Sequence, residues 1–224
     1  VSGAASGLGR GIAEWFLREK QCRIVALDRN AEGLAGLVSE MGCDSVQVAA
    51  VDITSGGEVQ AAIGAGHARF GSIDVCLNFA GVVAPIRIFD PKTGKVDLDG
   101  FKSAVDVNLA GTFNVMAHCA ERMRHNESGD DGERGVVVNV ASAAAFDGQV
   151  GQAGYASSKA GVVGLSLPSA RELARFGVRV ACIAPGAFDT PMLRSVPDTV
   201  VDRIVDTIQF PKRVGKIAEI AGLC

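Results

Sequence analysis

Tyr155 and Lys159 lie four positions apart, which places them on one face of a helix if this stretch is helical. Tyr155 is the only tyrosine of the chain. A phenol has an ordinary pKa of about 10, too high for a good base at neutral pH. An ammonium group about 4 Å away stabilises the phenolate by roughly 4 kcal/mol, enough to bring proton transfer into the neutral range. The pair therefore predicts a proton-transfer site, with Tyr155 as acid or base and Lys159 as its partner.

Ser142 supplies a second hydroxyl, directly after an apolar stretch at 135–140 that reads as a buried strand. A substrate oxygen held between Ser142 and Tyr155 would have its developing charge stabilised while Tyr155 exchanges the proton. This arrangement suits the interconversion of a secondary alcohol and a ketone. We therefore expect Ser142 and Tyr155 to contact the substrate.

Short β-branched stretches alternate with helical ones along the chain, which predicts a parallel sheet with right-handed crossovers. We expect strands at 23–27, 46–52, 73–78, 135–140 and 178–184, most of them apolar on both faces, as in buried parallel strands. We expect helices at 8–20, 31–41, 56–70, 99–126 and 155–176. The predicted fold class is α/β: a Rossmann-like doubly wound sheet with helices on both faces, in a single domain over 1–224.

A glycine-rich loop opens the chain, with glycines at 3, 7 and 9 between a strand end and a helix. Gly3 permits a tight turn, Gly7 lets the backbone approach a pyrophosphate, and Gly9 lets the helix pack closely. The helix N-terminus would direct free N–H groups and a positive dipole end at phosphates. The predicted cofactor-binding residues of this loop are Ser2, Gly3, Ser6, Gly7, Leu8 and Gly9.

Asp28 ends the following strand, 19 residues after Gly9. An acidic residue there can accept the ribose hydroxyls of an adenosine, and it repels a 2′-phosphate. Asp28 therefore favours NAD over NADP. The neighbouring Arg29 could instead meet a 2′-phosphate, but we give Asp28 the greater weight.

Two further strand ends should contribute to the same site, because open α/β sheets bind ligands at the carboxyl ends of their strands. Asp52 and Ile53 could bracket an adenine ring. Small residues follow the next strand and would let the cofactor lie against the backbone. The predicted cofactor-binding residues there are Asn78, Ala80 and Gly81.

Composition narrows the function classes. Hydrophobic residues make up 48% and charged residues 21% of the 224 residues, which is typical of a globular domain. The net charge of -3 gives no reason to expect nucleic-acid binding. No apolar run approaches the roughly 18–20 residues of a membrane span. The six cysteines are scattered without a CxxC pair, so we expect buried reduced thiols and no metal site.

The two ends of the sequence begin and stop within expected elements, so we expect a domain truncated at both ends. The chain opens without Met at what reads as a strand end. We expect a cytoplasmic protein, or one of the mitochondrial matrix if a targeting segment was removed. Two loops, at 84–100 and 127–135, exceed the usual length, and 189–215 reads as a substrate lid.

With these motifs the sequence resembles the short-chain dehydrogenase/reductase family over nearly its whole length. The resemblance rests on the glycine loop with Ser2 where Thr is usual, on Asn78-Phe79-Ala80-Gly81, and on Ser142, Tyr155 and Lys159. It implies that Asn108 completes a catalytic tetrad by holding a water in a proton relay to Lys159. It also implies a nicotinamide cradle made of Pro185, Gly186, Phe188 and Thr190.

Within the family, the segments AFDGQVGQA before Tyr155, VDVNLAGTFNV, NESGDDGERGVV and Leu167-Pro168 are similar to those of 3-hydroxyacyl-CoA dehydrogenases. The resemblance implies NAD, a 3-hydroxyacyl-CoA substrate, a homotetramer, and Gln149 in contact with the bound acyl group. One alternative is an NADPH-dependent 3-oxoacyl-carrier-protein or acetoacetyl-CoA reductase. Another, of a different class, is a scaffold subunit of a multiprotein complex in which catalysis is incidental.

Overall fold

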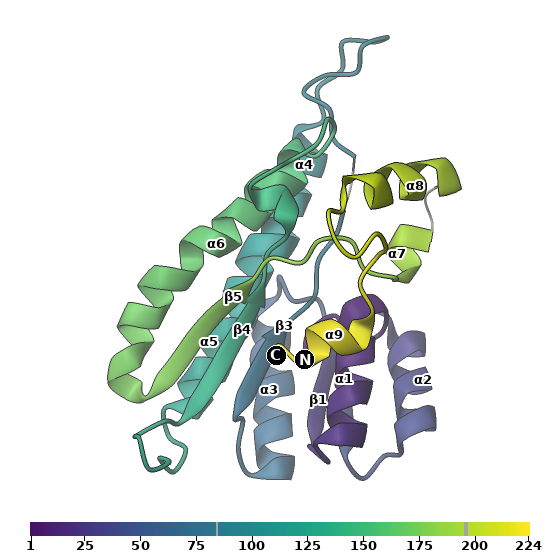
Figure 1. The fold of residues 1–224 in the computed structure, drawn as a ribbon. Helices are drawn as coiled ribbons and strands as arrows, with labels where there is room; N and C mark the ends of the chain where they lie inside the picture. The colour runs from purple at the N-terminus through teal and green to yellow at the C-terminus, as the bar shows by residue number, and fades with distance from the viewer. Residues whose placement is uncertain (84, 195–196) are drawn as a thin grey trace.

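A computed structural model describes residues 1–83, 85–194 and 197–224 (Figure 1). Ala84, the first residue of the expected loop at 84–100, lies outside the described residues, as do Ser195 and Val196 of the expected lid.

The five expected strands form a parallel sheet, which confirms the predicted fold class. They are β1 (Ile24–Asp28), β2 (Val46–Ala50), β3 (Val75–Asn78), β4 (Gly135–Val140) and β5 (Val178–Ile183). β1 pairs with β2, and β4 lies between β3 and β5. Ser2 joins the two groups through parallel bridges to Leu27 and Asn78, so the glycine loop leaves from the middle of the sheet.

The ends of several strands differ slightly from the expected ranges. The strand expected at 46–52 ends at Ala50, and the one expected at 73–78 begins at Val75. The strand expected at 23–27 runs from Ile24 to Asp28. Asp28 is therefore the last paired residue of β1, opposite Ala50 of β2.

Helices cover both faces of the sheet (Figure 1). The main ones are α1 (Gly7–Glu19), α2 (Ala31–Met41), α3 (Gly56–Phe70), α4 (Leu98–Val105), α5 (Thr112–Met123), α6 (Ala153–Leu173) and α9 (Ile217–Ala221). Side chains of α3 and α5 form one apolar core with the strands. Side chains of α1 form two others, one with α2 and one with α9. α1, α2, α3 and α5 each bury apolar side chains in these cores together with the apolar strands.

The prediction of a single helix at 99–126 is wrong in one respect. Between α4 and α5 the residues Asp106–Gly111 form a π-helix, η1, with Asn108 inside it. The hydroxyl of Thr112 donates to the backbone oxygen of Asn108 at 2.8 Å within this wider turn. Single π-type turns are rare and occur mostly at functional sites, and apolar periodicity gives no signal for them.

The segment after β5 carries two helices, α7 (Pro191–Arg194) and α8 (Asp198–Thr207), which lie apart from the sheet in Figure 1. Backbone hydrogen bonds close its base: Asp189 N donates to Gly215 O at 3.1 Å, and Gly215 N donates to Ala187 O at 2.9 Å. All six cysteines are free. Cys76 and Cys119 are buried as expected, whereas Cys43 is exposed.

Candidate active site

A cavity of about 450 Å³ opens at the carboxyl ends of the strands. The predicted residues that line it are Gly3, Ser6, Gly7, Leu8, Gly9, Asp28, Asp52, Ile53, Ala80, Gly81, Ser142, Tyr155, Lys159, Pro185, Gly186, Phe188 and Thr190. Ser2, Asn78, Asn108 and Gln149 are not part of this lining. The two groups of residues inferred separately from the sequence, for dinucleotide binding and for proton transfer, therefore share one cavity.

The glycine loop requires its glycines for reasons of space. Gly3 has a φ of 73°, and a Cβ there would lie 2.7 Å from the backbone nitrogen of Ala80. A Cβ on Gly9 would overlap the carbonyl oxygen of Gly3. Gly7 has a φ of 58°, which favours glycine, and a Cβ there would meet only Thr190, at a contact distance of 3.9 Å. The loop thus leaves room at the start of α1, where helix N–H groups lack helical partners.

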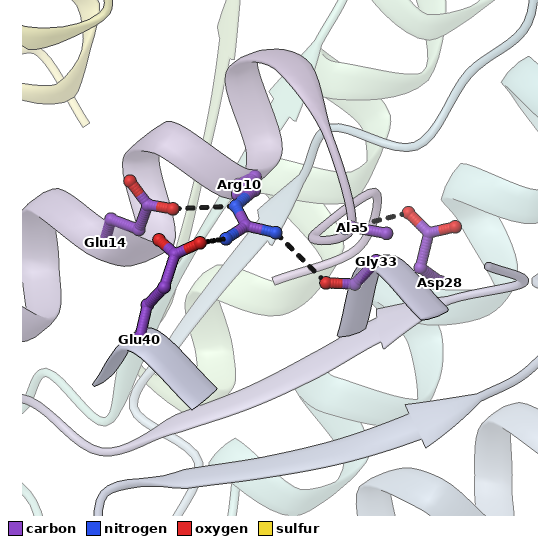
Figure 2. A network of polar contacts seen from close by, with 6 residues as sticks. All are labelled: Ala5, Arg10, Glu14, Asp28, Gly33 and Glu40. Carbon is purple, nitrogen blue, oxygen red and sulfur yellow. Dashed lines mark hydrogen bonds and ion pairs between the residues drawn. The ribbon is translucent and has the colours of Figure 1, made fainter. Parts of the chain in front are cut away.

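Asp28 is held by backbone amides on both sides, and Figure 2 shows the bond from Ala5. Ala5 N of the glycine loop donates to Oδ2 at 3.0 Å, and Asn30 N donates to Oδ1 at 2.9 Å. Each carboxylate oxygen can accept further hydrogen bonds. The carboxylate is therefore oriented at the cavity wall and retains acceptor capacity for a ligand hydroxyl.

Asp52 and Ile53 form the wall beyond Asp28. Thr54 donates twice to Asp52 Oδ1, from N at 2.9 Å and from Oγ1 at 2.8 Å, and these bonds lower the pKa of Asp52 below its usual range. Ile53 is buried, and its carbonyl oxygen accepts a bond of 2.8 Å from Asn114 Nδ2 of α5. This end of the cavity therefore combines an ionised carboxylate with a fixed apolar side chain.

Ser2 and Asn78 lie beneath the cavity and not in its wall. Ser2 Oγ donates to Asn78 Oδ1 and accepts from Ala80 N, both at 3.3 Å. Asn78 Nδ2 donates to Asn139 Oδ1 of β4 at 2.9 Å. All three polar side chains are buried. They hold the backbone at Ala80 in place, which is a supporting role that the strand-end position alone did not reveal.

Ser142, Tyr155 and Lys159 line the other end of the cavity. The ammonium of Lys159 donates to Val140 O at 2.7 Å and lies 6.0 Å from the centre of the Tyr155 ring. Burial lowers the pKa of Lys159 to about 8. Ser142 Oγ accepts a bond of 3.2 Å from Ala144 N, which keeps the serine at the end of β4. A phenol, a hydroxyl and a buried cation are thus available for one substrate oxygen.

Asn108 stands behind this end of the cavity with its side chain fully engaged. Its Oδ1 accepts from Val82 N at 2.7 Å. Its Nδ2 donates to Val82 O at 3.0 Å and to Ser158 Oγ at 2.9 Å. A Cβ on Gly81 would lie 3.1 Å from Asn108 Oδ1 and 3.5 Å from Lys159 Nζ, so the three residues lie close together.

Gln149 is not part of the cavity lining. It is exposed, and its backbone N donates to Gln152 Oε1 at 3.0 Å. The expected contact with a bound acyl group came only from the resemblance and stays a prediction.

Arg29, weighed above as a possible partner of a 2′-phosphate, also lines the cavity. Several further lining residues were not among the predicted site residues: Asn30, Val51, Phe79, Val82, Val83, Val107, Val140, Ala141 and Pro191. Most are chain neighbours of the predicted residues at strand ends, so extending each predicted strand end by one or two residues would have found them. Val107 is the exception, because it enters the cavity from the π-helical turn.

Among the residues that the structure describes, no helix is both long and apolar enough to cross a membrane. Nor do the described residues contain a group of three or more His, Cys, Asp or Glu side chains arranged to hold a metal ion.

Comparison with known proteins agrees with this geometry. The model of the short chain dehydrogenase family matches residues 1–200. The chain is 42% identical over 224 residues to the 3-hydroxyacyl-CoA dehydrogenase type-2 of Homo sapiens, covering 100% of this chain and 85% of that protein. It is 31% identical to a 3-oxoacyl-acyl-carrier-protein reductase of Staphylococcus epidermidis, over 99% of this chain and 86% of that protein.

A solved structure is also similar. The crystal structure of 3-hydroxyacyl-CoA dehydrogenase type-2 from Mycobacterium avium matches with a TM-score of 0.90 and 34% sequence identity, covering 99% of this chain and 85% of that one. The family resemblance inferred from the motifs is confirmed. The chain belongs to the short-chain dehydrogenase family, whose members are oxidoreductases that use nicotinamide cofactors.

Proposed function

We propose that this enzyme uses NAD to interconvert a 3-hydroxyacyl-CoA and a 3-oxoacyl-CoA. The observation that carries the proposal is the shared cavity, which has the Asp28 carboxylate at one end and Ser142, Tyr155 and Lys159 at the other. The relatives named 3-hydroxyacyl-CoA dehydrogenase type-2 support the substrate class.

The residues of the cavity fit a dinucleotide. Gly3 and Gly9 let the loop and α1 pack closely, and the start of α1 beside Gly7 can then accept a pyrophosphate. Asp28 and the ionised Asp52 favour ribose hydroxyls over a 2′-phosphate. Arg29 also lines this end of the cavity, and its positive charge could meet a 2′-phosphate. We give the two carboxylates the greater weight. We therefore propose NAD as the cofactor, with NADP disfavoured by charge.

We propose that Tyr155 transfers the proton. A nicotinamide bound between Pro185, Gly186 and Thr190 would supply or accept the hydride. In the oxidative direction, Ser142 donates to the substrate oxygen while the phenolate of Tyr155 removes the hydroxyl proton. Reduction runs through the same steps in reverse, and Tyr155 then donates the proton.

Lys159 supplies the positive charge that favours the phenolate. With a pKa of about 8, it is mostly protonated at pH 7, and its burial strengthens its interaction with a nearby negative charge. Asn108 keeps Val82 and Gly81 in position behind it. We propose that Asn108 serves catalysis from there, as the fourth member of the group.

Substrate specificity should come from the apolar part of the cavity. Val82, Val83, Phe188 and Pro191 line it beside Ser142 and Tyr155. These side chains suit the alkyl part of an acyl chain. Within the cavity we propose Ser142 and Tyr155 as substrate contacts, and Gln149, outside its lining, as a further contact to the acyl group.

The test is oxidation of 3-hydroxyacyl-CoA substrates of several chain lengths, with hydroxysteroids as comparison alcohols. We expect the specificity constant to be highest for an acyl-CoA with NAD and much lower with NADP. A strong preference for NADPH and for a 3-oxoacyl carrier protein would instead identify a reductase. Absence of turnover with every acyl-CoA would overturn the substrate class.

We also propose a homotetramer assembled partly through α5 and α6. Phe113 of α5 and Leu167 of α6 are large apolar side chains with 52% and 56% of their surface exposed in the single chain. Burial of these side chains between subunits would stabilise the assembly. Sedimentation of the wild-type protein and of Phe113→Glu would test it; a wild-type monomer at micromolar concentration would overturn this proposal.

A further inference from the structure

Arg10 of α1 lies outside the cavity lining but ties together the two helices next to the glycine loop (Figure 2). Its Nε donates to Glu14 Oε1 at 2.7 Å. Its Nη1 donates to the carbonyl oxygen of Gly33, in the first turn of α2, at 3.1 Å. Its Nη2 donates to Glu40 Oε1, in the last turn of α2, at 2.7 Å. One guanidinium group therefore spans α2 from its beginning to its end.

Gly33 is the point where α2 touches the glycine loop. A Cβ on Gly33 would lie 2.8 Å from the Cβ of Ala5 and 2.9 Å from its carbonyl oxygen. The backbone N of Gly33 donates to Asn30 Oδ1 at 3.1 Å, which caps the helix. The position of the first turn of α2 thus determines where Ala5 and Asn30 can lie.

Ala5 and Asn30 are also the residues whose backbone amides hold the Asp28 carboxylate. A continuous series of contacts therefore runs from Arg10 through Gly33 to the residues that orient Asp28. Only an arginine can make all three bonds, because its planar fork has donors on three nitrogens, whereas a lysine ammonium is a single point.

We infer that Arg10 is a positioning residue for dinucleotide recognition, which acts through Gly33 and Ala5 on the carboxylate of Asp28. The inference rests on the proposed use of NAD. Without the guanidinium, the first turn of α2 keeps its cap from Asn30 and the apolar packing of Leu34, but it loses its bond to α1. Asp28 then meets the ribose hydroxyls less well, so NADH binding weakens. NADPH binding, which gains nothing from Asp28, changes less.

The experiment measures NADH and NADPH binding to the whole chain by energy transfer from Trp15, the only tryptophan and a residue of α1. We expect Arg10→Met to weaken NADH binding about 5-fold, to narrow the NADH-to-NADPH preference, and to leave kcat at saturating NAD unchanged. Arg10→Lys should recover part of the affinity. Arg179→Met is the matched control, since it removes a surface ion pair of 2.6 Å with Glu133 outside the cavity lining.

Unchanged NADH affinity and cofactor preference in Arg10→Met, with only a lower Tm, would reduce Arg10 to a structural ion pair and overturn the inference. If Arg10→Met does not fold, Glu40→Ala removes the acceptor of one of the three bonds and should weaken NADH binding in the same direction, by a smaller factor. Failure of the wild-type chain to bind NADH would overturn the proposed function as well. The wild-type and variant measurements therefore distinguish the two failures.

Discussion

The side-chain amide of Asn108 donates a hydrogen bond of 2.9 Å to the hydroxyl of Ser158, which joins the π-helical turn to α6. Ser158 Oγ in turn donates to the backbone oxygen of Tyr155 at 2.7 Å. Asn108 and Ser158 are both buried, so water cannot replace either partner easily. Tyr155, the proposed proton-transfer residue, is thereby linked through its backbone to the loop at Val82.

Ser158→Ala should both destabilise the protein and slow the reaction. It leaves one N–H of the buried Asn108 amide without a partner, which costs about 1–3 kcal/mol. We expect a lower midpoint in urea unfolding and a lower kcat, with NADH affinity unchanged. Ser166→Ala is the control, because Ser166 Oγ makes a comparable bond of 2.9 Å to Val162 O on the same helix. Equal effects of the two substitutions on kcat would contradict the coupling.

Tyr155→Phe should abolish turnover while NADH binding persists. The substitution removes only the phenol oxygen, which we propose carries the proton, and leaves the ring in the cavity wall. Loss of a general acid–base group typically costs about 10²–10⁴-fold in rate. Steady-state kinetics together with NADH binding would check this. Near-normal turnover would rule out Tyr155 as the proton-transfer residue.

Lys159 should make stability rise with pH in the alkaline range. Burial lowers its pKa in the folded state from 10.5 to about 8. Between these two values the unfolded chain binds more protons at this site than the folded chain, so the free energy of unfolding increases with pH there. Below pH 8 the buried ammonium lowers the free energy of unfolding by its full amount. Between pH 8 and 10.5 the free energy of unfolding should therefore rise by at most about 3 kcal/mol.

The measurement is urea unfolding of the wild type and of Lys159→Met at several pH values between 7 and 10.5. The difference in stability between the two proteins should shift in favour of the wild type across this window, because Lys159→Met removes the titration of this group. A difference that is constant with pH would show that Lys159 keeps its ordinary pKa in the folded protein.

Gly9→Ala should cost both stability and cofactor binding. Its Cβ would overlap the backbone carbonyl of Gly3, so α1 or the loop must move. We expect a loss of at least about 2 kcal/mol in unfolding free energy and a marked loss of NADH affinity. Gly57→Ala is the control, because a Cβ there in α3 meets nothing within 4 Å and should stabilise the helix by up to about 1 kcal/mol. Normal NADH binding by Gly9→Ala would contradict the close-packing argument.

Much of this protein could be predicted from the sequence, because parallel strands place their carboxyl ends at one edge of a sheet. Apolar strands alternating with helices predicted the architecture, and residues at strand ends, such as Asp28 and Ser142, therefore had to gather at one edge. The spacing of Tyr155 and Lys159 predicted a shared helix face, and both residues line the cavity. The roles assigned to these residues stay predictions until the substitutions are measured.

Only the tertiary structure decided which side chains face the cavity and which support it from behind. Ser2 and Asn78 follow the sequence pattern of the site but bond to each other and to Asn139 beneath it. The side-chain amide of Asn108 bonds to Val82 and Ser158. The π-helical turn that contains Asn108 cannot be recognised from the pattern of apolar residues. Arg10, which the sequence presents as one charge on a helix surface, joins α1 to α2 beside the glycine loop. These outcomes depend on hydrogen bonds between residues far apart in the chain, and sequence spacing constrains only residues that share one element.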